Sequence, residues 1–194
     1  LLQAAPPPPP DLTQESDPAH ISYTSGTTGK PKGAVLAHEP TTRACNCIAE
    51  RLQLTRHDVT LGATALSSSY QLVVNLLPGL LRGATVQVMS RWEINKAWQV
   101  MTEREVTYLP ANPTILREVL ERTRQAGQMP NKLRMGISGG GPVPPDLKRA
   151  WRDEFKLPLV ESYGQSELGG FVGLGYPALV TDDKLLAVGP ALPD

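Results

Sequence analysis

The sequence contains 194 residues, with 19 basic and 19 acidic side chains and a formal net charge of zero. A chain of this length buries a sizeable core and most often forms one domain. The balanced charge gives no electrostatic basis for a nucleic-acid or membrane-surface partner. No stretch approaches the roughly 18 consecutive apolar residues of a membrane span, and no basic-then-apolar leader is visible. We therefore expect a soluble protein of the cytoplasm.

The spacing of the cysteines and histidines argues against a zinc site. Cys45 and Cys47 lie two residues apart in a segment predicted as helical, where this spacing points them to different sides. No second cysteine pair exists, and the three histidines are dispersed along the chain. Two ordinary thiols in a reducing compartment fit this pattern.

Residues 1–16 are interpreted as a proline-rich linker, and residues 17–194 as the packed part of the chain. The run of five prolines at residues 6–10 donates no backbone hydrogen bonds and favours an extended form. A spacer is the preferred interpretation, and a ligand for an SH3-type domain is the alternative.

After the linker, short apolar runs alternate with longer amphipathic stretches. Strands are predicted at residues 19–23, 60–65, 85–89, 107–109, 133–138 and 159–162. Helices are predicted at residues 39–52, 70–81, 94–104, 114–126 and 144–155. This alternation predicts an α/β fold with a mostly parallel sheet and helices on both faces. In such sheets, ligands bind where loops leave the carboxyl ends of the strands.

Twelve residues at positions 23–34, directly after the first predicted strand, combine hydroxyls, three glycines and two ammonium groups. Glycines let backbone N–H groups approach an anion closely, while hydroxyls and lysines add donors and positive charge. A solvated turn with incidental lysines is the alternative, which the density and length of the segment disfavour. The predicted phosphate-binding residues are Thr24, Ser25, Gly26, Thr27, Thr28, Gly29, Lys30 and Lys32.

Two familiar nucleotide motifs are absent. The GxxxxGK[ST] loop requires a glycine where this chain has Thr24, and a serine or threonine where it has Pro31. A GxGxxG fingerprint cannot be drawn either, because the next glycine after Gly141 is Gly164.

The glycine-rich segment YTSGTTGKPKG, residues 23–33, resembles the signature loop of the adenylate-forming enzymes. This superfamily comprises acyl- and aryl-coenzyme A ligases, peptide-synthetase adenylation domains and beetle luciferases. Further matches follow in the family's order: LRMGISGGGP at 133–142, ESYGQSE at 161–167 and VGPALP at 188–193. The resemblance runs from about residue 17 to the last residue.

The resemblance implies ATP, Mg²⁺ and coenzyme A as co-substrates or cofactors and a small carboxylic acid as the substrate. Residues 24–32 would wrap the β- and γ-phosphates, Tyr163 would stack on adenine, and Ser166 would reach the α-phosphate. Ser166 replaces the family's common threonine, so it keeps the hydroxyl and loses the methyl that restricts its rotamer. Glu167 matches the magnesium carboxylate. The other residues implied to contact the nucleotide are Gly139, Gly140, Gly141, Pro142, Glu161, Ser162 and Gly164.

Catalysis by Lys30, Ser166 and Glu167 would be electrostatic, because one anion attacks another and pyrophosphate departs. Taken alone, Glu167 is more often a surface charge, Tyr163 a core aromatic, and the three glycines at 139–141 a plain turn. The sequence does not define the walls of the acyl-binding site, and Tyr70, Asn112, Ser138 and Gly164 are candidate wall residues.

The implied function is ATP-dependent formation of an acyl-adenylate, followed by thioester formation with coenzyme A. Gln165 favours this subclass over peptide-synthetase domains, which commonly have proline there. A carrier protein in place of coenzyme A, and a truncated noncatalytic paralogue that binds nucleotide or a partner, are the alternatives. The family's opening subdomain, ribose-binding aspartate, hinge and C-terminal domain with its lysine are not in this sequence. We therefore expect the isolated chain to have little or no ligase activity and at most weak affinity for ATP.

Overall fold

The computed structural model describes residues 12–24 and 29–193. Its strands are β1 (Pro18–Thr24), β2 (Lys32–Ala37), β3 (Val59–Gly62), β4 (Thr85–Val88), β5 (Tyr108–Ala111), β6 (Met135–Ser138), β7 (Leu159–Gln165) and β8 (Gly170–Leu174). Its α-helices are α1 (His38–Arg51), α2 (Ser69–Gln71), α3 (Leu77–Leu81), α4 (Ile94–Glu103), α5 (Pro113–Ala126) and α6 (Pro145–Ala150). Two π-helical turns, η1 (Leu72–Leu76) and η2 (Trp151–Phe155), and two 3₁₀ turns, η3 (Ser166–Leu168) and η4 (Asp182–Lys184), complete the elements.

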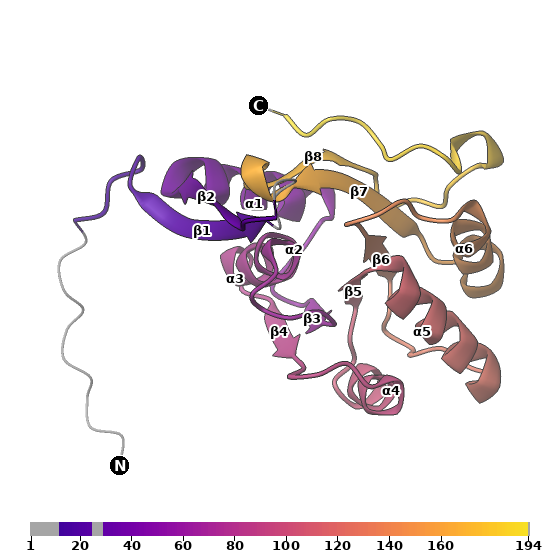
Figure 1. Ribbon diagram of the computed structural model, residues 1–194. Helices are drawn as coiled ribbons and strands as arrows, with labels where there is room; N and C mark the ends of the chain where they lie inside the picture. Colours follow the sequence, from indigo (N-terminus) through magenta and orange to yellow (C-terminus); the bar gives the residue numbers. More distant parts are fainter. Residues whose placement is uncertain (1–11, 25–28, 194) are drawn as a thin grey trace, which may run out of the picture.

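A six-stranded sheet with the order β4-β3-β5-β6-β7-β8 forms the centre of the molecule (Figure 1). The five strands from β4 to β7 are parallel, and β8 runs antiparallel to β7 at the edge. Parallel neighbours require crossover connections, and the helices between the strands provide them. The predicted mostly parallel sheet is confirmed.

Both faces of the sheet are covered by helices, as successive residues of β5 show. Tyr108 packs into an apolar cluster with residues of α1 and η1, whereas Leu109 packs into a second cluster with residues of α4, α5 and α6. Side chains alternate between the two faces along a strand, so a fully buried β5 needs apolar cover on each side. The three-layer arrangement predicted from the sequence is therefore present.

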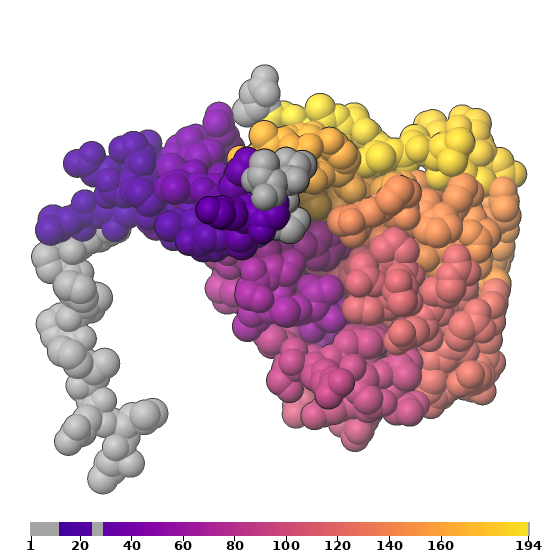
Figure 2. Space-filling view, in the orientation of Figure 1, coloured from indigo at the N-terminus to yellow at the C-terminus, as the bar shows by residue number. Residues whose placement is uncertain are grey.

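The first strand departs from the prediction, because it does not join the parallel sheet. β1 pairs with β2 in a separate antiparallel ribbon, with Ile21 opposite Val35 and Tyr23 opposite Gly33. The ribbon extends from the body of the molecule (Figure 2), and its residues Ile21, Tyr23 and Val35 are exposed. Residues 32–37, directly after Pro31, form the strand β2, which was not among the predicted strands. The glycine-rich segment is therefore a hairpin connection, not a loop at the edge of the main sheet.

Two predicted helices contain a π-helical turn, and two carbonyl groups of the first turn accept side-chain hydrogen bonds from other elements. In η1, the carbonyl of Val74 accepts a hydrogen bond from the Tyr108 hydroxyl at 2.7 Å, and that of Val73 accepts from the Cys45 thiol at 3.8 Å. These contacts attach the turn to β5 and α1. Local periodicity does not report such partners, because they come from distant segments.

β7 is longer than predicted, because β8 pairs with its second half. Tyr163 and Gly164 were expected in a loop, but they lie in the strand opposite Gly173 and Phe171, with an irregularity between them. Residues 170–174 contain two glycines and gave no strand signal. In the described part of the chain, no helix has the length and apolar character needed to cross a membrane.

Candidate functional site

The ribbon formed by β1 and β2 contacts η3, the segment that carries Ser166 and Glu167. Ser25, Gly26, Thr27 and Thr28 lie outside the described residues. Of their neighbours, Thr24 ends β1, Gly29 has a positive φ of 80°, and Lys30 and Lys32 are exposed. Both β1 and β2 contact η3. The structure therefore brings together the two-stranded ribbon and the η3 segment, which are more than a hundred residues apart in the sequence.

Ser166 and Glu167 lie in η3, between β7 and β8. The Ser166 hydroxyl is 2.9 Å from the hydroxyl of Ser69, the first residue of α2. Glu167 is exposed. Among residues 12–24 and 29–193, no three His, Cys, Asp or Glu side chains gather as a metal-binding group. A Mg²⁺ ion here would need phosphate oxygens and water beside the single carboxylate, which is a coordination that Mg²⁺ commonly adopts.

Residues 139–142, which we call the glycine strip, leave the carboxyl end of β6. Gly139 is buried, and a Cβ there would lie 2.9 Å from Cε2 of Tyr70 and would also clash with the Ser162 hydroxyl. Gly140 and Gly141 are exposed, and a Cβ on either would meet no atom within 4 Å. The strip therefore presents bare backbone to open space, where a flat group can approach closely.

The remaining motif residues fall into two groups. Tyr163 is 53% exposed, and its hydroxyl accepts a hydrogen bond from Gln165 Nε2 at 3.2 Å. The Ser162 hydroxyl is buried and donates to the Ser138 carbonyl at 2.8 Å. Gly164 is confined by β8, since a Cβ there would lie 2.9 Å from the carbonyl carbon of Gly170. Tyr163 is therefore available to a ligand, whereas Ser162 is bonded to β6 and Gly164 is packed against β8.

Glu161 is engaged by other groups of the protein. One carboxylate oxygen accepts a hydrogen bond from the Val143 backbone N–H at 3.3 Å, and the other forms an ion pair with Lys148. Its side chain is only 10% exposed. Both oxygens are thus engaged within the protein.

A pocket of about 220 Å³ lies between α2, the glycine strip and the β7–β8 hairpin. Serine hydroxyls and glycine backbone form one part of its wall, and an apolar part is formed by side chains of α2, η1 and β8. Its lining residues are Ser68, Ser69, Tyr70, Val73, Gly140, Gly164, Gln165, Ser166, Gly170 and Phe171.

Tyr70 anchors the pocket to the sheet. Its hydroxyl donates to the carbonyl of Ile137 at 3.1 Å and lies 3.4 Å from that of Ala111, at the ends of β6 and β5. Burial of this hydroxyl raises the pKa of Tyr70 well above its ordinary value, so the group stays a neutral donor. The Tyr70 ring meets Phe171 edge to face, with centroids 5.8 Å apart.

Sequence reasoning found some of this wall and missed the rest. Tyr70 and Gly164 line the pocket, whereas Asn112 caps α5 by accepting from the Ile115 N–H at 2.9 Å, and Ser138 is buried within β6. Ser69 and Phe171 were not singled out. Three consecutive serines stand at residues 67–69 of the sequence, but nothing in the sequence pairs them with Ser166.

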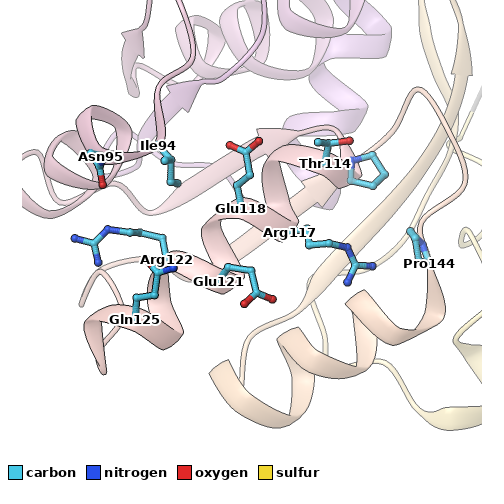
Figure 3. A pocket seen from close by; sticks show the side chains of 10 residues that line it. Ile94, Asn95, Thr114, Arg117, Glu118, Glu121, Arg122, Gln125 and Pro144 are labelled. Atoms are coloured by element: carbon cyan, nitrogen blue, oxygen red, sulfur yellow. The ribbon is translucent and has the colours of Figure 1, made fainter.

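A larger groove of about 640 Å³ lies on the helical side, between α4, α5 and the start of α6 (Figure 3). Two of its charged side chains have partners outside the lining: Arg117 pairs with Asp146 at 2.9 Å, and Glu118 accepts from the Trp92 indole N–H at 2.7 Å. None of the described motif residues lines it. We therefore place the candidate site at the 220 Å³ pocket and the adjoining glycine strip.

Comparison with known families gives a match over nearly the whole chain. The model of the AMP-binding enzyme family matches residues 2–194. Among curated proteins, a feruloyl-CoA synthase of Amycolatopsis sp is 33% identical over 167 residues, which are 86% of this chain and 34% of that protein. The human mitochondrial medium-chain acyl-CoA ligase ACSF2 is 29% identical over 185 residues, 91% of this chain and 30% of that protein.

Solved structures show the same similarity in three dimensions. The o-succinylbenzoate coenzyme A synthetase of Bacillus subtilis in complex with AMP has a TM-score of 0.83 and 30% identity, covering 93% of this chain and 36% of that one. The same enzyme has been solved with ATP and a magnesium ion, at 29% identity and the same TM-score of 0.83, over 93% of this chain and 37% of that one. The chain thus spans about a third of the length of the relatives it matches.

Proposed function

The chain belongs to the AMP-binding enzyme family, and from this premise we propose that residues 17–194 are the central part of an adenylation domain. The parent enzyme would activate a carboxylic acid with ATP as an acyl-adenylate and transfer the acyl group to coenzyme A. Support for coenzyme A as the acceptor comes from the relatives, which are named as CoA synthases and ligases. A carrier protein as the acceptor is the alternative that the sequence left open.

One observation carries the proposal: motif segments far apart in sequence meet at one edge of the molecule. The glycine strip follows β6, Ser166 follows β7, and the ribbon that holds the lysine-containing hairpin contacts η3. A plain turn, a surface carboxylate and an incidental lysine have no reason to converge. Their convergence is expected of a site that binds one extended ligand with a flat base and a polyphosphate.

The exposed groups of this edge suit the chemistry of ATP. Bare backbone at Gly140 and Gly141 fits a flat adenine ring, with Tyr163 available to stack on it. We propose that the Ser166 hydroxyl donates to the α-phosphate, while Lys30 and Lys32 neutralise the outer phosphates. Because the acid and the phosphate are both anions, this neutralisation lowers the barrier to attack at the α-phosphorus.

Glu167 is the residue that would hold Mg²⁺. Mg²⁺ held there would supply positive charge that offsets the negative charge of the phosphate groups. The exposed position of Glu167 beside Ser166 fits this role, since the ion needs open positions for phosphate oxygens and water.

For the acyl group, we propose the 220 Å³ pocket beside Ser166. Tyr70, Val73 and Phe171 provide its apolar part, which suits a compact aryl or short branched acid rather than a long chain. The serines in its wall would lie beside the reacting carboxylate and the α-phosphate.

The test is a titration of the ¹⁵N-labelled chain with Mg·ATP, followed by NMR. We expect saturable shifts of the amide signals of Gly140, Gly141 and Ser166, with weak affinity. Glu167→Gln should reduce the difference between Mg·ATP and metal-free ATP. The control Glu103→Gln, an exposed glutamate at the end of α4 that accepts from Gln99, should behave like the unaltered chain. Absent or scattered shifts at millimolar nucleotide would contradict the proposal.

A further inference from the structure

A buried lysine in α6 is connected through Glu161 to the residue after the glycine strip. Lys148, in α6, has a side chain that is 2% exposed. Its ammonium donates to the carbonyl groups of Leu185 at 2.9 Å and Ala187 at 3.1 Å, and it forms an ion pair with Glu161. An ammonium group has three protons, so these three acceptors satisfy it completely.

The partner carboxylate faces the strip. Glu161, on β7, receives Lys148 on one oxygen and the Val143 N–H on the other, at 3.3 Å. Val143 is the residue directly after the glycine strip. Glu161 therefore connects β7 to the end of the strip, and Lys148 extends the connection to α6.

The third segment is the C-terminal strap, residues 176–193, which crosses back over β8 (Figure 1). Beyond Ala187 the strap runs beside β8, where Leu174 N–H donates to Pro190 O at 3.1 Å and Leu192 N–H donates to Val172 O at 2.9 Å. Lys148 thus binds the strap just before it reaches the strand that contains Phe171. Strap, strip and β7 meet at one ion pair.

A buried ion pair at such a position carries a desolvation cost. Removing both charges from water is unfavourable, and apolar pairs of similar volume are often as stable or more stable. The charged pair instead makes directional hydrogen bonds. Each bond to Val143, Leu185 or Ala187 fixes a backbone group at a defined position. Apolar contact gives no such definition.

We propose that Lys148 and Glu161 are positioning residues, which hold the glycine strip and the C-terminal strap against β7 without contacting the nucleotide themselves. The role of the strip in nucleotide binding rests on the proposed function above. The placement of strip and strap does not, and it is tested separately. Glu161 thereby takes a different role from the direct nucleotide contact that the resemblance implied.

Amide hydrogen exchange of the 194-residue chain tests the placement. In Lys148→Met, the amides of Val143, Leu185 and Ala187 should exchange about tenfold faster. The substitution removes the ammonium group that bonds to the strap and to Glu161, so both the strap and the end of the strip are held less firmly. The double variant Lys148→Met/Glu161→Gln removes both buried charges and keeps an acceptor for Val143. It should recover most of the lost thermal stability and the protection of Val143, while Leu185 and Ala187 stay fast. Arg149→Met, on the exposed side of α6, is the matched control and should change nothing.

The outcomes separate the two proposals. Unchanged exchange of Val143 and Ala187 in a folded Lys148→Met chain overturns the positioning role. If that variant does not fold, the double variant decides, because slow exchange at Leu185 and Ala187 there overturns it equally. For the nucleotide, AMP-induced shifts at Gly140 and Gly141 should shrink in Lys148→Met and remain in Arg149→Met. No AMP response in the unaltered chain counts against the proposed function alone, and the exchange result still decides the positioning role.

Discussion

The hydroxyl groups of Ser69 and Ser166 lie 2.9 Å apart, although 97 positions separate the two residues in the sequence. Ser166 stands where the related enzymes commonly have threonine, whose methyl group restricts the side-chain rotamer. A hydrogen bond from α2 provides a different restriction for a serine. Ser69 therefore orients the hydroxyl that we propose for the α-phosphate.

The first prediction follows from this contact. Ser69→Ala should weaken the Mg·ATP-induced shift of the Ser166 amide several-fold, because the Ser166 hydroxyl becomes free to rotate. Adding Ser166→Thr to this variant should restore the response, since the methyl group takes over the restriction. NMR titration measures both. The control Ser67→Ala, at an exposed neighbouring position, should have no effect. If the Ser69→Ala chain responds like the unaltered one, the orienting role is wrong.

Gly139 and Gly141 give a matched pair of substitutions in the glycine strip. A Cβ at Gly139 would meet Tyr70 at 2.9 Å and the Ser162 hydroxyl, whereas one at Gly141 would meet no atom within 4 Å. Gly139→Ala should therefore destabilise the chain by about 1–3 kcal/mol through overpacking. Gly141→Ala should leave stability nearly unchanged. Urea unfolding followed by fluorescence provides the comparison, and equal midpoints for the two variants would contradict the packing described around Tyr70.

The two cysteines should differ in reactivity. Cys45 is completely buried, and burial raises the pKa of its thiol to about 12, so almost no thiolate forms at neutral pH. Cys47 is half-buried, on the side of α1 near Pro193. A maleimide probe should label one thiol per native chain, at Cys47, and two after unfolding. Mass spectrometry of the labelled peptides checks this, and rapid native labelling of Cys45 would show that α1 does not pack as described.

The sequence was sufficient for the order of strands and helices from residue 59 to residue 162, because local periodicity and capping residues determine those elements. It was not sufficient for β2 and β8. These strands are short, contain glycine, and depend on a partner strand rather than on their own pattern. The same limit applies to the site. Motif residues were visible as residue types, but the Ser69–Ser166 contact and the Lys148–Glu161 pair depend on how distant segments pack, which spacing along the chain does not encode.

The stability of the chain should depend on pH through Asp58, which lies at the end of the sheet opposite the candidate site. It precedes β3 and accepts hydrogen bonds from the Thr55 N–H at 2.8 Å, the Thr107 hydroxyl at 2.7 Å and the Arg134 guanidinium at 2.8 Å. Burial alone would raise the pKa of Asp58, but these three donors together lower it below its ordinary value, with Arg134 the largest contributor among them. The contacts connect the starts of β3, β5 and β6.

Because the pKa of Asp58 is lower in the folded than in the unfolded chain, its contribution to stability is complete above the unfolded value of about 3.9. The contribution is lost as the pH falls through the folded value. Asp58→Asn should therefore reduce the free energy of unfolding by about 2 kcal/mol at neutral pH, since charged hydrogen bonds of this kind contribute about 1.5–3 kcal/mol. The difference from the unaltered chain should shrink below about pH 4. Asp146→Asn, which breaks an exposed pair with Arg117, should cost less than about 1 kcal/mol. Urea unfolding at neutral and acidic pH measures both, and a difference for Asp58→Asn that stays constant with pH would contradict this network.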